Sequence, residues 1–142
     1  MKEAVGDIWQ YPADRHVITT NGAVRADGAC VMGRGVAQQA RDKYPGLDME
    51  IGRAIKAYGN HVFGCGIGGI LTFPVKHHWR DAADPLLIMR SILEIIQWAD
   101  ESGDKVIVMP RPGCGNGRLH WVDVRHLCKY LDDRFVVIER YG

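Results

Sequence analysis

The sequence lacks both a strong excess of charge and any long apolar run. Its 18 Lys and Arg residues face 17 Asp and Glu residues, so the formal net charge is +1 at pH 7. Proteins that hold long duplex DNA through its phosphates are usually strongly basic, which disfavours that class but leaves room for a nucleotide or a short single strand. Apolar runs such as residues 85–89 are far too short to cross a membrane, and the first residues lack the apolar stretch of a signal peptide. We therefore expect a cytoplasmic protein with no membrane contact.

Paired cysteines are also lacking. Cys30, Cys65, Cys114 and Cys128 are widely spaced and form no CxxC pair, so they predict neither a zinc framework nor a disulfide scaffold. His77 and His78 are adjacent, and neighbouring side chains on an extended chain point in different directions, which does not favour a shared metal ion. We expect reduced thiols, no bound metal and no cofactor.

No internal repeat, low-complexity tract or linker divides the chain. A length of 142 residues, with 46% hydrophobic and 25% charged residues, is typical of one compact globular domain. We therefore predict a single domain over residues 1–142, present as a monomer.

Strand-like and helix-like segments alternate along the chain. The clearest helix is predicted over residues 85–100, with Asp84 as its N-cap, Pro85 in the first helical position and Gly103 at its end. Other helices are predicted at 36–43, 48–58 and 121–131, and strands at 4–9, 16–20, 105–109 and 135–139, with a bent strand pair over 61–75. This alternation predicts an α/β fold with helices on both faces of a mixed sheet, in which ligands bind beyond the carboxyl ends of the strands.

A first glycine-rich loop follows the strand at 16–20. Asn21 and an insertion-like stretch, residues 23–30, precede Gly33, Arg34, Gly35 and Val36 at the start of a helix. Glycines at a helix entrance let a phosphate approach the backbone closely, and the free amides of the first turn then donate hydrogen bonds to it. Taken alone, the pattern fits a plain turn with glycines at positive φ about equally well.

A second glycine-rich loop follows the strand at 105–109. It contains Gly113, Cys114, Gly115, Asn116 and Gly117, and again precedes a helix. No Walker lysine or Rossmann spacing is present, which disfavours a kinase, a P-loop protein or a dinucleotide-dependent dehydrogenase. Two anion-binding loops at the same edge of one sheet suit a diphosphate.

Between the loops lies the most basic and aromatic stretch of the chain. Lys76 follows a buried strand, where desolvation would lower its pKa and make its amine nucleophilic; the alternative is a solvated surface lysine. Trp79 and Arg80 could stack on a base and meet a phosphate, with His78 beside them, or Trp79 could simply cover the sheet edge.

Taken in order, these segments resemble the macrodomain family, whose members bind ADP-ribose. The resemblance covers nearly the whole chain and implies a three-layer α/β/α fold with a central mixed sheet. It implies that Asp7 and Ile8 bind the adenine, and that Asn21 lies near the distal ribose. It also implies that residues 33–37 and 113–117 are the two phosphate loops.

Within the family, residues 73–80 and 113–121 resemble the DarG antitoxin branch, which removes ADP-ribose from thymidine in single-stranded DNA. That branch is related to the terminal ADP-ribose protein glycohydrolase, which cleaves ADP-ribose esters on glutamate. Both use a lysine in this loop, and Lys76 matches it. The resemblance thus implies an ADP-ribosyl glycohydrolase with Lys76 as its catalytic residue and His78, Trp79 and Arg80 as candidate DNA contacts.

The chain also departs from these relatives. Gly117 stands where the protein glycohydrolase has a catalytic Asp, and His120 where DarG-like chains have an Asp. The loop at 22–30 is longer, and DarG has a further domain that we do not expect here. Two alternatives remain open at this point. One is a non-catalytic ADP-ribose reader, and the other is a hydrolase of ADP-ribosylated protein, O-acyl-ADP-ribose or ADP-ribose 1″-phosphate.

Overall fold

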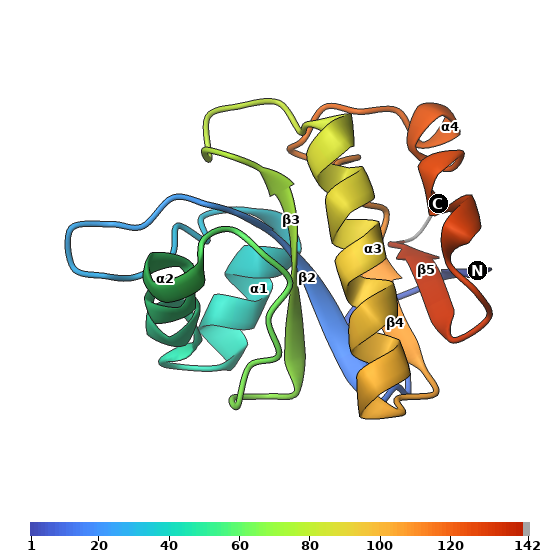
Figure 1. Cartoon of the computed structure of the whole chain (residues 1–142), viewed down its shortest axis with the longest axis horizontal. Coiled ribbons are helices and arrows are strands. Elements are labelled where there is room, and N and C mark those ends of the chain that lie inside the picture. Colours follow the sequence, from blue (N-terminus) through green and yellow to red (C-terminus); the bar gives the residue numbers. More distant parts are fainter. Residues whose placement is uncertain (141–142) are drawn as a thin grey trace.

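The computed structural model describes residues 1–140 and has three layers, with a five-stranded sheet between two layers of helices (Figure 1). The strands are β1 (Lys2–Val5), β2 (Arg15–Asn21), β3 (Ile70–Lys76), β4 (Ile107–Pro110) and β5 (Phe135–Glu139). The α-helices are α1 (Gly35–Lys43), α2 (Leu47–Tyr58), α3 (Pro85–Ser102) and α4 (Trp121–Val124). Two 3₁₀ helices complete the list, η1 (Ile8–Gln10) and η2 (Leu127–Tyr130).

The strand order is β1-β5-β4-β2-β3, and all four strand pairs are parallel. The connections from β2 to β3, from β3 to β4 and from β4 to β5 each carry helices back to the starting end of the sheet. A crossover of this kind makes consecutive strands parallel. The expected mixed sheet is therefore not found among the strands of residues 1–140. Antiparallel pairing is limited to isolated bridges, Val24 with Cys30 and Gly64 with Leu71.

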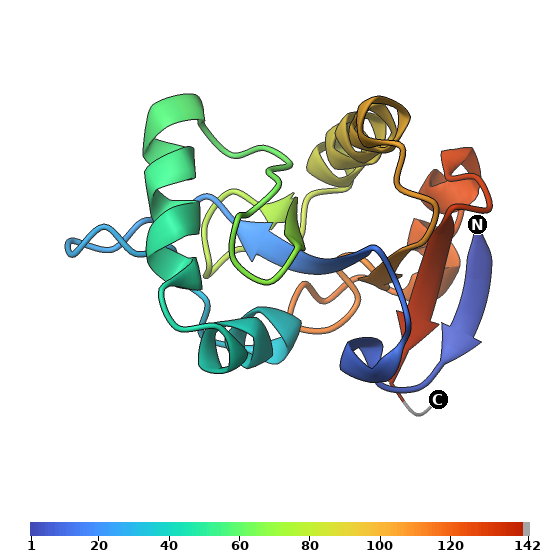
Figure 2. The ribbon, with the colours of Figure 1, turned by 90° about the horizontal axis from the view of Figure 1, so that it is seen from below.

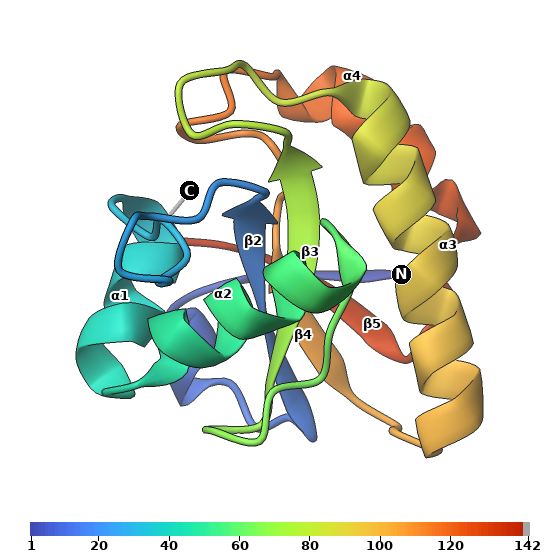
Figure 3. The ribbon, with the colours of Figure 1, turned by 60° about the vertical axis from the view of Figure 1, so that its left-hand side comes forward.

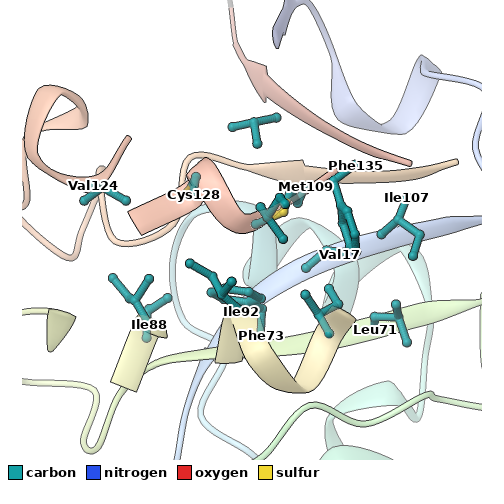
Figure 4. Close-up of a cluster of buried hydrophobic side chains, with 14 of the residues drawn as sticks. Val17, Leu71, Phe73, Ile88, Ile92, Ile107, Met109, Val124, Cys128 and Phe135 are labelled. Atoms are coloured by element: carbon teal, nitrogen blue, oxygen red, sulfur yellow. The ribbon is translucent and has the colours of Figure 1, made fainter. Parts of the chain in front are cut away.

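Each strand sends successive side chains to opposite faces of the sheet. Val17 packs on the face covered by α3, α4 and η2, whereas the next residue, Ile18, packs on the face covered by α1 and α2 (Figure 2). On the first face, Ile88 and Ile92 of α3 meet Phe73 of β3 (Figure 4). This burial on both faces confirms the three-layer α/β/α architecture.

Helix α3 begins and ends as its sequence predicts. The Asp84 carboxylate accepts a hydrogen bond from the Leu86 amide at 2.9 Å, Pro85 is in the first turn, and Gly103 adopts φ 75° at the end. The strands at β2 and β5 and the helices at α1 and α2 also lie within a residue or two of their predicted ranges.

Three other predicted elements were wrong in extent. The first strand ends at Val5, because Asp7 caps the 3₁₀ turn that follows. Residues 61–69 form no strand of their own, although they run antiparallel along β3 through Thr72 N–Phe63 O and Cys65 N–Ile70 O bonds. The predicted helix at 121–131 is divided into α4 and η2.

Candidate functional site

Two adjoining cavities open at the carboxyl ends of the strands. The first, about 470 Å³, lies beyond β2, β3 and β4, and the second, about 590 Å³, lies between η1, the start of α1 and the end of β5. Both volumes are typical of small-molecule sites. The two cavities share Gly35, Val36, Pro110, Arg111, Cys114 and Gly115, so the glycine-rich loops form the boundary between them. An elongated ligand with its most polar part at the loops would fit this arrangement.

Most of the predicted site residues line these cavities. The first cavity is lined by Asn21, Gly33, Arg34, Lys76, Trp79, Asn116 and Gly117, besides other loop residues, and the second by Asp7 and Ile8. His78 and Arg80 do not line either cavity but flank Trp79. Segments that lie far apart in the sequence meet here because parallel strands end at the same edge of the sheet (Figure 3).

The first loop presents the uncapped start of α1 to the first cavity. Arg34 occupies the N-cap position and makes no side-chain cap, so no side chain satisfies the amides of the first turn. Gly35 has φ 61°, a conformation that favours glycine. A Cβ added to Gly33 would meet no atom within 4 Å, so only open space lies over that backbone. This loop can receive an anion against its backbone amides.

The second loop is held tightly by its own packing. Gly113 has φ 75°, and a Cβ there would lie 2.9 Å from the Cβ of Ala83. At Gly117 a Cβ would lie 2.5 Å from the carbonyl oxygen of Gly113, so no side chain can stand at this position unless the loop moves. Gly115, in contrast, faces open space.

Lys76 lies at the end of β3 and points to the second loop. Its Nζ donates hydrogen bonds to the carbonyl oxygens of Asn116 at 3.1 Å and Trp79 at 3.4 Å. Burial, and then the nearby guanidinium groups of Arg118 and Arg34, lower the pKa of Lys76, while Asp81 acts in the opposite direction. Lys76 is therefore not the fully solvated lysine of the alternative interpretation. Because its pKa is lowered, its neutral amine is populated at a lower pH than that of an ordinary lysine.

Asp7 and Ile8 form one end of the second cavity. The Asp7 carboxylate accepts a hydrogen bond from the Trp9 amide at 2.9 Å and so caps η1, while Ile8 is buried against β4 and β5. The Trp9 indole donates to Gln39 of α1 at 2.9 Å. The loop after β1 is therefore fastened to α1, with Asp7 on the cavity wall.

Asn21 uses both ends of its amide within the neighbouring loop. Its Nδ2 donates to the Val31 carbonyl at 3.0 Å, and its Oδ1 accepts from the Ala23 amide at 2.9 Å. These bonds close the base of the long loop at 22–30. An asparagine side chain has a second N–H and a second lone pair, so Asn21 still has capacity for a ligand in the first cavity.

Three side chains cluster at the rim of the first cavity. Trp79 is 49% exposed, and the centre of its ring lies 5.4 Å from the centre of the His78 ring, which is tilted to it by 34°, and 5.2 Å from the Arg80 guanidinium. His77 instead pairs with the Asp84 carboxylate at 2.8 Å. Among residues 1–140, no group of three or more His, Cys, Asp or Glu side chains could hold a metal ion.

Sequence reasoning missed Arg111, which lines both cavities. It forms an ion pair with Glu139 at 3.1 Å and lies 4.8 Å above the Trp121 ring. Trp121, His120 and Gln39 were missed as well, all in the second cavity. The position of Arg111, directly after a buried strand, is the signal that could have found it.

The cysteine at the junction of the cavities is not a reactive thiol. Burial raises the pKa of Cys114, and its Sγ donates to the Pro112 carbonyl. Burial raises the pKa values of Cys30, Cys65 and Cys128 to about 12. No helix within the described residues has the length and apolar character needed to cross a membrane.

Comparison with known proteins supports the resemblance suggested by the motifs. No protein-family model matches the chain. The solved macrodomain of Mycobacterium tuberculosis DarG has a TM-score of 0.82 and 27% identity, and the match covers 99% of this chain and 97% of that one. The complex of Thermosipho africanus DarTG with ADP-ribose shares the fold, with a TM-score of 0.82 at 22% identity over 98% of this chain and 41% of that one. The DNA ADP-ribosyl glycohydrolase of M. tuberculosis is 31% identical over 104 residues, and the match covers 66% of this chain.

The chain has the macrodomain fold, and it is similar to the macrodomain of M. tuberculosis DarG. The region matched in the M. tuberculosis glycohydrolase is only 29% of that protein's length, so the similarity concerns one part of the relative.

Proposed function

We propose that this macrodomain binds ADP-ribose across both cavities and hydrolyses the bond that joins ADP-ribose to thymidine in single-stranded DNA. The observation that carries the proposal is the position of the Lys76 amine, beside the second phosphate loop and facing the first cavity. The name of the M. tuberculosis relative, DNA ADP-ribosyl glycohydrolase, supports the same activity.

The ligand would lie with its adenosine in the second cavity and its distal ribose in the first. Asp7 would accept a hydrogen bond from the adenine amino group, next to the buried Ile8. The diphosphate would lie between residues 33–36 and 113–117, where Gly33 and Gly115 leave the backbone open. Helix-terminal amides suit this charge without any metal ion. Asn21 and Lys76 would then face the distal ribose.

Lys76 would act at the anomeric carbon of that ribose. Overall, water adds to this carbon, the bond to the base breaks, and the base leaves with the proton. A neutral Lys76 amine can add to the anomeric carbon of the opened sugar while the base is still attached; the base then leaves with a proton from the amine, and the resulting Schiff base is hydrolysed by water. Its ammonium form can instead assist departure of the base. Trapping with borohydride distinguishes these routes, because only a Schiff base is reduced to a stable adduct on Lys76.

Two features favour a DNA base over a glutamate ester as the modified group. Position 117 carries no carboxylate, and a side chain there would require the loop to move, because its Cβ would meet the Gly113 carbonyl oxygen. At the mouth of the cavity, the clustered His78, Trp79 and Arg80 offer aromatic and cationic surface of the kind that holds single-stranded bases. The net charge of +1 limits the contact to a few nucleotides.

The test is release of ADP-ribose from a short single-stranded oligonucleotide modified on thymidine, compared with a glutamate-modified peptide. We expect release from the DNA by the wild type and a loss of at least about 100-fold in Lys76→Ala. Binding of free ADP-ribose to the variant, measured by calorimetry, controls for an intact fold. If neither substrate is turned over while ADP-ribose still binds, the proposal fails and leaves a reader or a small-nucleotide hydrolase. Turnover of O-acyl-ADP-ribose or ADP-ribose 1″-phosphate alone would identify a small-nucleotide hydrolase.

A further inference from the structure

Arg118 has a backbone conformation that its side chain does not favour. It is the only non-glycine residue with positive φ, 66°, in the part of the chain that the structure describes. Glycine would adopt this conformation without strain, and strained residues of this kind persist where the surrounding structure holds them, often at functional sites. The Arg118 amide donates to the Gly115 carbonyl at 3.1 Å, which closes the turn.

The Arg118 side chain reaches across to the segment that carries Lys76. Its Nη2 donates to the carbonyl oxygen of Arg80 at 3.1 Å, on the rim of the first cavity. The two preceding residues of the loop bind the same segment. The Asn116 carbonyl accepts from Lys76 Nζ at 3.1 Å, and the Gly117 carbonyl accepts from the Ala83 amide at 3.0 Å. Each of residues 116–118 thus makes at least one hydrogen bond to the segment 76–83.

More of the charged groups near Lys76 lower its pKa than raise it. Arg118, on the second loop, and Arg34, at the start of α1, both disfavour a charged amine, whereas Asp81, on the rim itself, favours it. Burial acts in the same direction as the two arginines and is the largest effect. Removing the Arg118 side chain would release the rim at Arg80 and take away one of the two cations near the amine.

We infer that Arg118 is a positioning residue, which fastens the rim at residues 77–82 to the second phosphate loop and so fixes the Lys76 amine between them. The inference rests on the proposed function in that it assigns Arg118 to the same reaction. It explains why an arginine occupies a position where glycine would be unstrained.

The experiment compares the wild type with Arg118→Gly, Arg118→Lys and Arg125→Ala. Arg125→Ala is the matched control, because it removes one exposed arginine that pairs with Glu3 and lines neither cavity. The reactivity of Lys76 towards acetic anhydride is followed by mass spectrometry from neutral to alkaline pH, together with Tm, and with kcat and KM for the thymidine-modified oligonucleotide.

In Arg118→Gly we expect an unchanged or higher Tm, since glycine relieves the backbone. We also expect Lys76 labelling to move to higher pH and kcat to fall, because one of the two cations that lower the Lys76 pKa is lost and the rim is no longer held at Arg80. Arg118→Lys, which keeps the charge, should recover part of both losses, and Arg125→Ala should behave as the wild type. Arg118→Gly with wild-type labelling and kcat would overturn the inference. If the wild type released no ADP-ribose, the proposed function would fail, while the labelling profile would still test Arg118.

Discussion

The two glycine-rich loops look alike in sequence but use their glycines differently. In the first loop, a Cβ added to Gly33 would meet no atom within 4 Å, and Gly35 is needed for its positive φ. In the second, Gly113 and Gly117 are required by packing, because a Cβ would strike neighbouring atoms, and only Gly115 is open. Each loop therefore presents one unobstructed glycine to the cavity. The remaining glycines shape the backbone.

The loops also differ in what they hold. The first starts α1 and carries an unused set of helix-terminal amides. The second is bonded through residues 116–118 to the segment that bears Lys76. We infer that the first loop contributes binding alone, whereas the second loop couples binding of the diphosphate to the position of the amine.

The largest effect is expected from Gly117→Asp, which would introduce the carboxylate found at this place in the protein glycohydrolase. Since a Cβ lies 2.5 Å from the Gly113 carbonyl oxygen, the loop must move, and we expect a loss of about 2–5 kcal/mol in the free energy of unfolding. Urea denaturation measures it. A variant as stable as the wild type would mean that the second loop is not held by its packing.

Lys76 should give the reaction a rising pH profile. Because burial and two arginines lower its pKa, the neutral amine appears at lower pH than for an ordinary lysine, and the rate should rise with pH through that value. Under single-turnover conditions, release of ADP-ribose from the modified oligonucleotide should increase several-fold between neutral and mildly alkaline pH. A rate that falls over this range would assign the reactive state to the ammonium form.

Substitution of the two unobstructed glycines, Gly33 and Gly115, should weaken ligand binding without changing the stability of the fold. Gly33→Ala and Gly115→Ala each place a methyl group over backbone that would face the diphosphate, so we expect affinity for ADP-ribose to fall about tenfold at unchanged Tm. Gly66→Ala is the matched control, since its Cβ would make only ordinary contact with Glu50. If both loop variants bind ADP-ribose with unchanged affinity in calorimetric titrations, the diphosphate does not bind at Gly33 and Gly115.

The smaller of the two effects on stability is expected at Asn21. Asn21→Ala loses the bonds to Val31 and Ala23 that close the long loop at 22–30, which should lower the free energy of unfolding by about 1–2 kcal/mol. Thermal denaturation with and without ADP-ribose separates this role from ligand contact. If Asn21 touches the distal ribose, the stabilisation by ADP-ribose will shrink as well.

Capping residues and glycine-rich sequences correctly predicted the ends of α3 and the positions of the two loops. Asp84, Pro85 and Gly103 mark the ends of α3 as the structure has them, and the glycine-rich sequences lie where predicted, at strand ends. The division of residues 121–131 into two short helices had no clear local signal. The parallel direction of all four strand pairs was missed because it depends on how each crossover returns, a property of the whole chain.

By itself, the sequence determined the α/β alternation and the positions of the two glycine-rich loops, because composition, capping and glycine spacing act over a few residues. Lys76 was selected by the family resemblance. Only the tertiary structure decided which glycines are free for a ligand, since that depends on atoms from other segments, such as Ala83 against Gly113. It also decided the surroundings of Lys76. The burial and the arginines that lower its pKa come from a loop about forty residues away and from the start of α1, which parallel strands bring to one edge of the sheet.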